Sequence, residues 1–476
     1  MRAETRNPQR EWYPPKQWVS IPRRSRGPGN RVRLCLLVSG TLYSQPANRN
    51  HERVINPKAL TLSFFPQRWL ILIILNAAYF FVYFHRISTA VLAPYLMEAF
   101  QASGASLGAM SSAYFYPYAL SQPVVGILTD RFGTRKVITV CIFIEFLGAL
   151  IFALAPTLLI ASLGRGLIGL GAAGVFVPSL KVLIPWFGPQ AFARMNAILL
   201  AVGNLGAITA ATPFAWVIQQ VGWRSSFFII SAILFLLTFL SAAFIRDHPA
   251  GHVATPESPG GAPSSKPGEF LEILKSPFYW VIFALFYAYG GPFSTFQGLW
   301  GYPYLIDVLG YDKLGASNLI MVIAFGVIAG GPLMAHWVDK PFARKKRPFL
   351  SACLAVQVVI WFLIAFLSPR FGSWAFGLVF FTMGMMLSGT LSVVWGIVRE
   401  EAPPEKLGTA MGVINPAPFL GVATFQPLTG YLMDRAGRVA GAFTPAAYQN
   451  AFTLCLAAIF MAFMISLLFL KKKSPE

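Results

Sequence analysis

The sequence predicts an all-α membrane protein in which twelve helices cross the bilayer in two sets of six. Hydrophobic residues make up 56% of the 476 residues and charged residues only 12%, whereas a typical soluble domain has about 25% charged residues. Twelve apolar runs are long enough to cross a bilayer, which takes about 20 residues each. A polar stretch after the sixth run divides them evenly. This composition argues against a soluble enzyme, a nucleic-acid-binding domain and a disordered scaffold.

The chain divides by composition into five parts. Residues 1–67 form a basic tail rich in Pro, Arg and Asn, which we expect to be disordered and to lie near anionic headgroups; the alternative is that translation begins nearer Phe64. Residues 68–245 hold the first six runs, and residues 278–470 hold the second six. Residues 246–277 form a cytoplasmic linker rich in Pro and Gly, and residues 471–476 form a short basic tail.

Lys and Arg residues are distributed unequally between the loops on the two sides of the spans. If the N-terminus is cytoplasmic, the inner loops and the C-terminus hold 17 of them and the outer loops hold five, and 13 more lie in residues 1–68. The positive-inside rule then predicts that both termini are cytoplasmic, in a cell membrane or, in a bacterium, the inner membrane. The expected spans are residues 68–93, 106–128, 136–155, 158–184, 195–218, 226–245, 278–303, 315–338, 348–368, 373–398, 407–432 and 447–470.

The two halves resemble each other in register. Pro94–Glu98 closes the first span and Pro303–Asp307 closes the seventh, at an offset of 209 residues that also carries Asp130 onto Asp339. Duplicated six-span halves place a substrate cavity at their interface, near the middle of the membrane. The sequence therefore predicts a central cavity between two pseudo-symmetric bundles.

The loop after the second span resembles the signature of the major facilitator superfamily, G-x-L-x-D-R-x-G-x-R-[RK]. The matching positions are Gly126, Leu128, Asp130, Arg131, Gly133, Arg135 and Lys136. Gly126 would allow a close approach between helices, and Asp130 would accept from helix N-terminal amides or pair with an arginine. The resemblance implies a conformational latch between the halves, with Asp339 as the second-half counterpart of Asp130.

Further matches extend this resemblance over about residues 68–470. Arg165–Gly171 fits the family's R-x-x-x-G-x-G pattern, and Gly430–Arg435 looks like the usual end of its eleventh span. The second-half loop departs from the signature, with Ala335 and Lys340 where the first half has Gly126 and Arg131. The Gly-Pro typical of proton-driven drug antiporters is also missing, because Thr212 stands before Pro213. The resemblance thus implies a secondary carrier that works by alternating access, without a cofactor.

Four charged residues within the spans are candidates for function, since a charge at bilayer depth must be paired or line a cavity. Arg86 is the preferred contact for a substrate carboxylate, the alternative being a structural pair. Glu145 and Arg165 are candidates for proton coupling; the alternatives are a permanent pair between Glu145 and Arg165 or Arg86, and a helix–helix brace at Arg165. We expect Lys181 to extend to the inner headgroups. His85 either titrates near neutral pH and contacts substrate, or is a hydrogen-bonded packing residue.

Uncharged side chains complete the expected substrate site. Thr295, Gln297 and Trp300 of the seventh span are expected to line the cavity, with Thr295 opposite Arg86, and the alternative is an aromatic membrane belt. Gly290, Gly291 and Pro292 are expected to unwind that helix and free its carbonyl groups. The weaker candidates are Tyr114, Tyr118 and Asn415.

The sequence lacks a nucleotide-binding loop, a metal-ligand spacing and a catalytic triad order, so we expect neither an enzyme nor a metal. The Arg86 region and the second-span tyrosines resemble organic-anion symporters and lysosomal dipeptide carriers most closely. The resemblance implies a monomer that moves an organic anion, a dipeptide or an amino-acid-like solute, together with protons, across the lipid bilayer. The alternatives are a drug or siderophore exporter and, in another class, a non-transporting membrane sensor. No nucleic acid is expected as a partner.

Overall fold

The computed structural model describes residues 57–249, 272–343, 345–367, 370–403, 406–439 and 441–468. Within them the chain is almost entirely helical. Most of the predicted N-terminal tail, most of the predicted linker and the predicted C-terminal tail lie outside these residues. Helix α1 begins at Pro57, eleven residues before the expected first span. Proline is well suited to the first helical position because its missing N–H would have no partner there.

The helices of the first half form six spans that pack into one bundle. They are α1 (Pro57–Phe100), α2 (Gly104–Ser112), α3 (Phe115–Phe132), α4 (Thr134–Leu154), α5 (Leu158–Ala173), α6 (Phe176–Thr209), α7 (Thr212–Val221) and α8 (Trp223–Phe244). α2 and α3 together make the second span. α5 and the first part of α6 make the fourth, and the rest of α6 with α7 makes the fifth.

The second half forms the other six spans and a short hairpin. Its elements are α10 (Pro277–Thr295), the π-helical turn η1 (Phe296–Trp300), α11 (Gly301–Asp307), α12 (Lys313–Asp339), α13 (Lys346–Phe362), the π-helical turn η2 (Leu363–Leu367), α14 (Ser373–Glu401), α15 (Leu407–Ile414), α16 (Ala417–Ala436), β1 (Arg438–Val439), β2 (Ala442–Phe443) and α17 (Pro445–Leu468). β1 and β2 pair antiparallel. α10, η1 and α11 make the seventh span, and α15 with α16 makes the eleventh.

Within the described residues, eight helical segments are by themselves long and apolar enough to cross a membrane. One of them, Leu158–Thr209, holds two spans, because the helix is broken at Gly188, where φ is 76°. A single helix of that length would extend about 80 Å, far more than a bilayer needs. The second, seventh and eleventh spans are built from shorter pieces, and counting them gives the twelve spans predicted from the sequence.

Proline explains where most of these spans break. Pro117, Pro178, Pro213 and Pro418 each lie in the first turn of the second piece of a broken span. A proline lacks the N–H that would continue the preceding helix, but it fits the first turn of a new one. The apolar periodicity alone could not reveal these breaks.

The seventh span differs from its prediction. We expected Gly290, Gly291 and Pro292 to unwind the helix, but α10 remains helical through Thr295 and the irregular turn η1 follows it. The two glycines serve packing instead: a Cβ on Gly290 would come within 2.5 Å of Pro418, and one on Gly291 within 2.9 Å of the backbone of Gly421. They allow α10 and α16 to approach closely.

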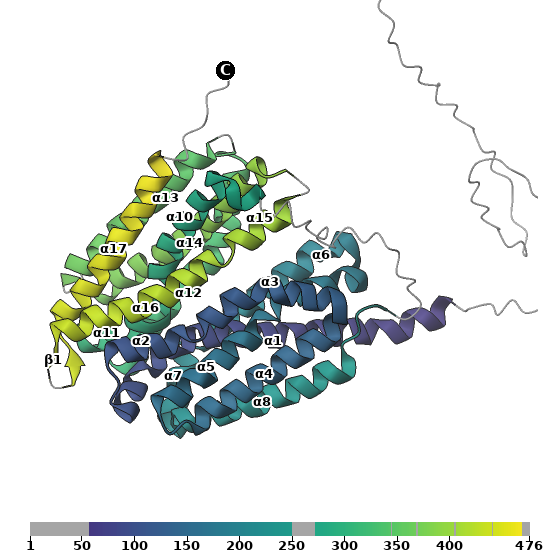
Figure 1. The fold of residues 1–476 in the computed structure, drawn as a ribbon, viewed down its shortest axis with the longest axis horizontal. Coiled ribbons are helices and arrows are strands. Elements are labelled where there is room, and N and C mark those ends of the chain that lie inside the picture. The colour runs from purple at the N-terminus through teal and green to yellow at the C-terminus, as the bar shows by residue number, and fades with distance from the viewer. Residues whose placement is uncertain are drawn as a thin grey trace, which may run out of the picture. The chain divides into compact units, whose positions relative to one another are not determined.

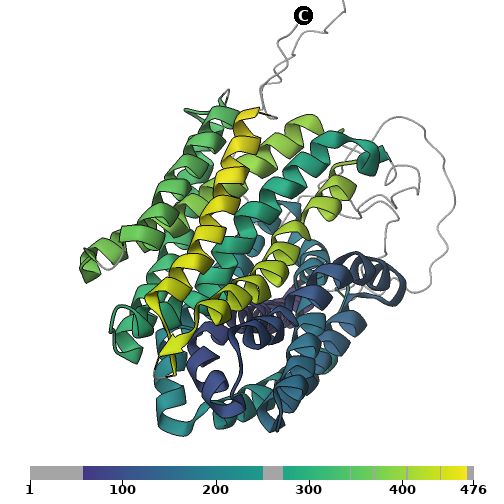
Figure 2. The ribbon, with the colours of Figure 1, turned by 60° about the vertical axis from the view of Figure 1, so that its left-hand side comes forward.

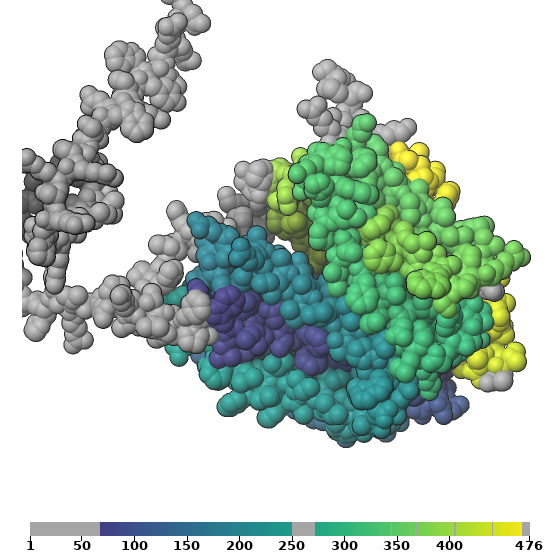
Figure 3. All heavy atoms as spheres, turned by 180° about the vertical axis from the view of Figure 1, so that it is seen from behind, coloured from purple at the N-terminus to yellow at the C-terminus, as the bar shows by residue number. Residues whose placement is uncertain are grey.

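The two bundles converge at one end and diverge at the other. Figure 1 shows the first bundle, in purple to teal, meeting the second, in green to yellow, near α2 and α11 and separating toward α6 and α15. Figure 2 gives the same arrangement from the side, with α17 in yellow along the second bundle. Seen from behind, the two halves touch along one side and a notch separates them at the other (Figure 3). We call the end near α2 and α11 the closed end, and the end that holds Asp130 and Lys346 the open end.

Each bundle buries an apolar core and also exposes large apolar side chains. On α8, for example, Ile233, Phe235 and Phe239 are exposed. Such a surface would be unfavourable in water and is suited to lipid. In membranes close helix packing depends on small residues, because lipid competes for apolar contacts.

A substitution at Gly384 tests this close packing between α12 and α14. A Cβ there would fall on the backbone of Ile323, whereas one on Gly377 of the same helix would meet no atom within 4 Å. We expect Gly384→Val to destabilise the detergent-purified protein by about 1–3 kcal/mol or more, because backbone cannot move aside as a side chain can. Thermal unfolding would measure this, and Gly377→Val is the matched control. Equal stability of the two variants would contradict this account.

Candidate functional site

The closed end is held by a carboxylate on a helix N-terminus. Asp434, at the end of α16, accepts hydrogen bonds from the backbone N–H of Gly104 (2.7 Å) and of Ala105 (2.8 Å), the first residues of α2. Both the unpaired N–H groups and the dipole of a helix N-terminus favour a negative charge there. Arg438 lies 3.6 Å from the same carboxylate and donates to the carbonyl oxygen of Ala102 (3.0 Å). These residues join the two halves.

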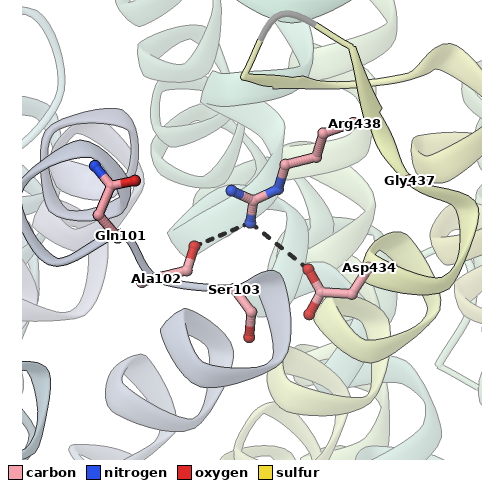
Figure 4. A pocket seen from close by; sticks show the side chains of 6 residues that line it. All are labelled: Gln101, Ala102, Ser103, Asp434, Gly437 and Arg438. Atoms are coloured by element: carbon pink, nitrogen blue, oxygen red, sulfur yellow. Dashed lines mark hydrogen bonds and ion pairs between the residues drawn. The ribbon is translucent and has the colours of Figure 1, made fainter.

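A recess of about 400 Å³ lies beside this contact, lined by Gln101, Ala102, Ser103, Asp434, Gly437 and Arg438. Figure 4 shows the Arg438 guanidinium between the Ala102 carbonyl group and the Asp434 carboxylate. The charged groups of the recess already bind one another, so the recess belongs to the closure between the halves and lies away from the charged groups at mid-span.

Glycines bring the two backbones into contact along the same seam. A Cβ on Gly104 would lie 2.7 Å from the carbonyl oxygen of Gly430, and a Cβ on Gly108 would overlap the backbone of Gln426. Further along, Tyr116 donates to the carbonyl oxygen of Ala423 (3.2 Å). The closure therefore extends from the end of the molecule to the middle of the spans.

At the open end the predicted latch is disengaged. Asp130 forms an ion pair with Lys181 of its own half, although we expected it to accept from helix amides or to pair with arginine. Lys181, which we expected to extend to headgroups, is thus held by a carboxylate. A Cβ on Gly126 would meet no atom within 4 Å, so this glycine makes no close helix contact in this conformation.

The remaining residues of the predicted latch stay within the first half or are exposed. Gly133 adopts a φ of 84°, which favours glycine. The backbone N–H of Arg135 donates to Asp247 (2.7 Å), and its guanidinium donates to the carbonyl oxygen of Ala242. Arg131, Lys136 and Asp339 are exposed.

Arg86 lies at the middle of the spans inside a cage of aromatic rings. Its guanidinium carbon is 4.7 Å from the ring centre of Tyr83, 4.7 Å from that of Tyr118 and 5.0 Å from that of Phe419. It also donates to the Tyr118 hydroxyl oxygen. Phe419 belongs to α16, so rings from both halves surround this cation. Such cation–π contacts stabilise a guanidinium without neutralising its charge.

No described carboxylate lies within ion-pair distance of Arg86, and its buried Nε atom has no hydrogen-bond partner. The structural alternative for Arg86 was a pair with an acid or with the backbone of another helix. Among the described residues it has neither, and its hydrogen bond goes to the Tyr118 hydroxyl oxygen. One turn toward the open end, Asn415 donates to Gln122 (2.6 Å), which links the halves again.

Glu145, His85 and Arg165 form a second group, wholly buried in the first half. The Glu145 carboxyl oxygen Oε1 lies 3.8 Å from His85 Nε2. Arg165 donates to the backbone carbonyl oxygen of His85 (3.0 Å) and packs against the ring of Tyr114. The alternative to proton coupling for Glu145 was a permanent pair with Arg165 or Arg86, but the basic side chain within ion-pair distance is His85. Both carboxyl oxygens lack a hydrogen-bond donor.

The predicted face of the seventh span is buried beneath the closure. Trp300 is fully buried and donates to Thr429 (2.9 Å). Thr295 and Gln297 are also buried. A Cβ on the intervening Gly298 would lie 3.0 Å from the carbonyl oxygen of Arg86, so this turn does pack beside the α1 site. Its role as a cavity lining stays a prediction.

Two important residues were not predicted as site members. Phe419 closes the cage around Arg86, and nothing in the sequence distinguishes it from the other phenylalanines. In the sequence, Asp434 appeared only within the Gly430–Arg435 match. The one indication of its role was that it stands in a motif like that of Asp130. Tyr114 and Tyr118, which were predicted, stack on each other between Arg86 and Arg165.

Comparison with known proteins identifies the family. Residues 75–417, well over half of the chain, match the family described as Major Facilitator Superfamily. The chain belongs to the major facilitator superfamily. It is thus a multi-pass membrane transporter, as predicted, and not an enzyme.

Several transporters of this superfamily are similar along most of their length. An uncharacterized transporter of Bacillus subtilis, YybO, is 25% identical over 84% of this chain and 94% of its own. The probable sulfoacetate transporter SauU of Cupriavidus necator is 24% identical over 78% of this chain and 88% of its own. The hexuronate transporter of Bacillus subtilis is also 24% identical, over 76% of this chain and 87% of its own.

Solved structures agree on the fold. A bacterial homologue of the human lysosomal transporter Spinster, in an inward-facing and unoccupied conformation, gives a TM-score of 0.69 at 19% identity and covers 86% of this chain and 99% of its own. The nucleoside transporter NupG, solved as a point mutant, gives a TM-score of 0.69 at 14% identity and covers 85% of this chain and 100% of its own. The two six-helix bundles of this carrier are therefore those of the superfamily.

Replacement of Asp434 tests the closure. We expect Asp434→Asn to lose charge-assisted hydrogen bonds worth about 1–3 kcal/mol, which shifts the balance between closed and open forms of this end about five- to 150-fold. Spin labels at exposed Val221 and Val439, with Cys35 replaced by Ser, report the separation of the two halves by double electron–electron resonance. The control is Arg435→Gln, since Arg435 is exposed and contacts Tyr431 of its own helix. An unchanged distance distribution for Asp434→Asn would count against the role of Asp434 in holding the closed end.

Proposed function

We propose that this carrier moves small organic anions by alternating access, together with protons, and that Arg86 binds the substrate carboxylate. The caged guanidinium is the observation that carries the proposal. A cation at mid-span is costly unless it is paired or faces water, yet Arg86 is partly exposed and has no described carboxylate partner. A substrate carboxylate would complete its coordination.

The names of the similar proteins support this substrate class. SauU is described as a probable sulfoacetate transporter and another relative as a hexuronate transporter. Both compounds are organic anions that contain a carboxylate, alone in hexuronate and beside a sulfonate in sulfoacetate, and a guanidinium binds a carboxylate through a planar fork of N–H donors. A dipeptide or amino-acid-like solute would also need an acid for its amino group, and the mid-span acid, Glu145, is completely buried.

The buried group around Glu145 supports proton coupling. An ionised carboxylate without hydrogen bonds is costly in an apolar interior, and both oxygens of the buried Glu145 carboxyl lack a donor, which makes this residue the candidate carrier of the proton. His85 lies beside it, and Arg165, bound to the His85 carbonyl group, connects through Tyr114 and Tyr118 to Arg86. This chain of contacts links a protonation site to the substrate site.

The charge distribution supports an orientation. Because the positive-inside rule places the loops around Asp130 and Lys346 in the cytoplasm, the closed end faces outward and the open end inward. The carrier would then be in an inward-open form, acting as a monomer in the cell membrane. Release of substrate on that side requires passage by the Gln122–Asn415 hydrogen bond.

Substitution of Arg86 tests the substrate contact. We expect Arg86→Ala to abolish uptake of radiolabelled glucuronate into proteoliposomes. Arg86→Lys keeps the charge but loses the two-pronged geometry, so it should weaken apparent affinity about tenfold or more. Arg370→Gln, at an exposed arginine, serves as the control for general effects of losing a positive charge. Normal uptake by Arg86→Ala, at matched protein content, would refute the assignment.

Substitution of Glu145 tests the coupling. We expect Glu145→Gln to abolish stimulation of uptake by an imposed proton gradient while leaving exchange of internal for external glucuronate, because exchange requires no net proton movement. Cys141→Ala, one turn away on α4 and also buried, is the matched control. Gradient-stimulated uptake that survives in Glu145→Gln would exclude this residue as the coupling site.

A further inference from the structure

The substrate site offers one accessible positive charge. In the sequence, the expected spans of the second half contain no Lys, Arg, Asp or Glu at all. In the first half, Arg165 is fully buried and Lys181 is paired with Asp130 at the open end. Arg86 is therefore the only cation of the described spans that is both at mid-span and partly exposed.

We infer that the substrate carries a single negative charge, a monocarboxylate in preference to a dicarboxylate or a phosphate monoester. This inference rests on the proposed function and narrows its substrate class. One accessible cation neutralises one anionic group. A second anionic group would have to remain unpaired in a site walled by apolar and aromatic side chains.

The geometry of the cage supports the same class. The ring centres of Tyr83, Tyr118 and Phe419 lie within about 5 Å of the central carbon of the guanidinium. One terminal nitrogen donates to the Tyr118 hydroxyl oxygen, and Nε has no partner, so the guanidinium keeps unused N–H donors that a planar carboxylate can accept from. A tetrahedral dianion would leave oxygens without donors against the rings.

The expected preference is large. An unpaired charge at membrane depth costs enough to lower affinity about a hundredfold. The hydroxyl and amide groups near the site, those of Tyr118, Gln122 and Asn415, can solvate a neutral polar substrate body but cannot neutralise a second charge. They are suited to the hydroxylated part of a sugar acid.

The test compares compounds that share a skeleton and differ in charge. Purified carrier in proteoliposomes takes up radiolabelled glucuronate in competition with glucarate, which has two carboxylates, with glucarate monomethyl ester, which has one, and with glucose 6-phosphate. We expect glucuronate and the monomethyl ester to compete with similar constants, and glucarate and the phosphate ester to compete at least about tenfold more weakly.

A charge-addition variant gives a second readout. Asn415 is one turn from Phe419 and partly exposed, so Asn415→Arg places a second cation near the first. We expect the ratio of glucarate to glucuronate affinity to rise at least about tenfold, whereas Asn450→Arg, which adds the same charge at an exposed asparagine of α17, leaves the ratio unchanged. The ratio is independent of expression level and of the total amount of active protein.

The outcomes separate the two proposals. If glucarate competes as well as its monomethyl ester in the unmodified carrier, the single-charge inference is wrong while organic-anion transport stands. If no carboxylate is taken up or competes in any form, the proposed function itself is wrong. A preference for the singly charged compounds that Asn415→Arg weakens at least about tenfold supports both.

Discussion

An unpaired guanidinium at the middle of the spans is the constraint around which the structure is organised. Water usually stabilises such a group, but the interior of a membrane contains almost no water. The chain replaces water with aromatic faces, two from the first half and one from the second. Because Phe419 comes from the opposite bundle, the surroundings of Arg86 are complete only when the halves are together near the site. If Arg86 binds substrate as proposed, binding and the relative position of the bundles are linked through this one side chain.

The two ends of the molecule use related chemistry in different states. At the closed end, Asp434 of α16 binds the N-terminus of α2, and glycines let the backbones touch. At the open end, Asp130 lies at the end of α3 and forms an ion pair with Lys181 of its own half. The Asp434 contact joins the end of a helix in one half to the start of a helix in the other half. A small change at this side chain can therefore shift the arrangement of two large rigid bundles.

The sequence predicts those features that depend on one segment at a time. Hydropathy and charge predict the spans, and the loop after the second span identifies the family that the comparison confirms. Arg86 is prominent because a charge in an apolar run is rare. Features that depend on register between segments distant in the chain could not be predicted. Phe419 is one phenylalanine among 42, and its place beside Arg86 follows only from how α16 packs on α2 and α3. The partner of Glu145 and the occupation of Asp130 by Lys181 depend on packing in the same way.

The exposure of the Asp130 side chain has a consequence for how the carrier responds to its surroundings. That side chain is 71% exposed, whereas the Asp434 side chain at the other end is 25% exposed. Dissolved ions screen exposed charges much more strongly than partly buried ones. A rise in the salt concentration at the open end therefore weakens the Lys181–Asp130 pair more than the contact at the closed end, so that in the proposed mechanism ionic strength would bias the balance between the two access states.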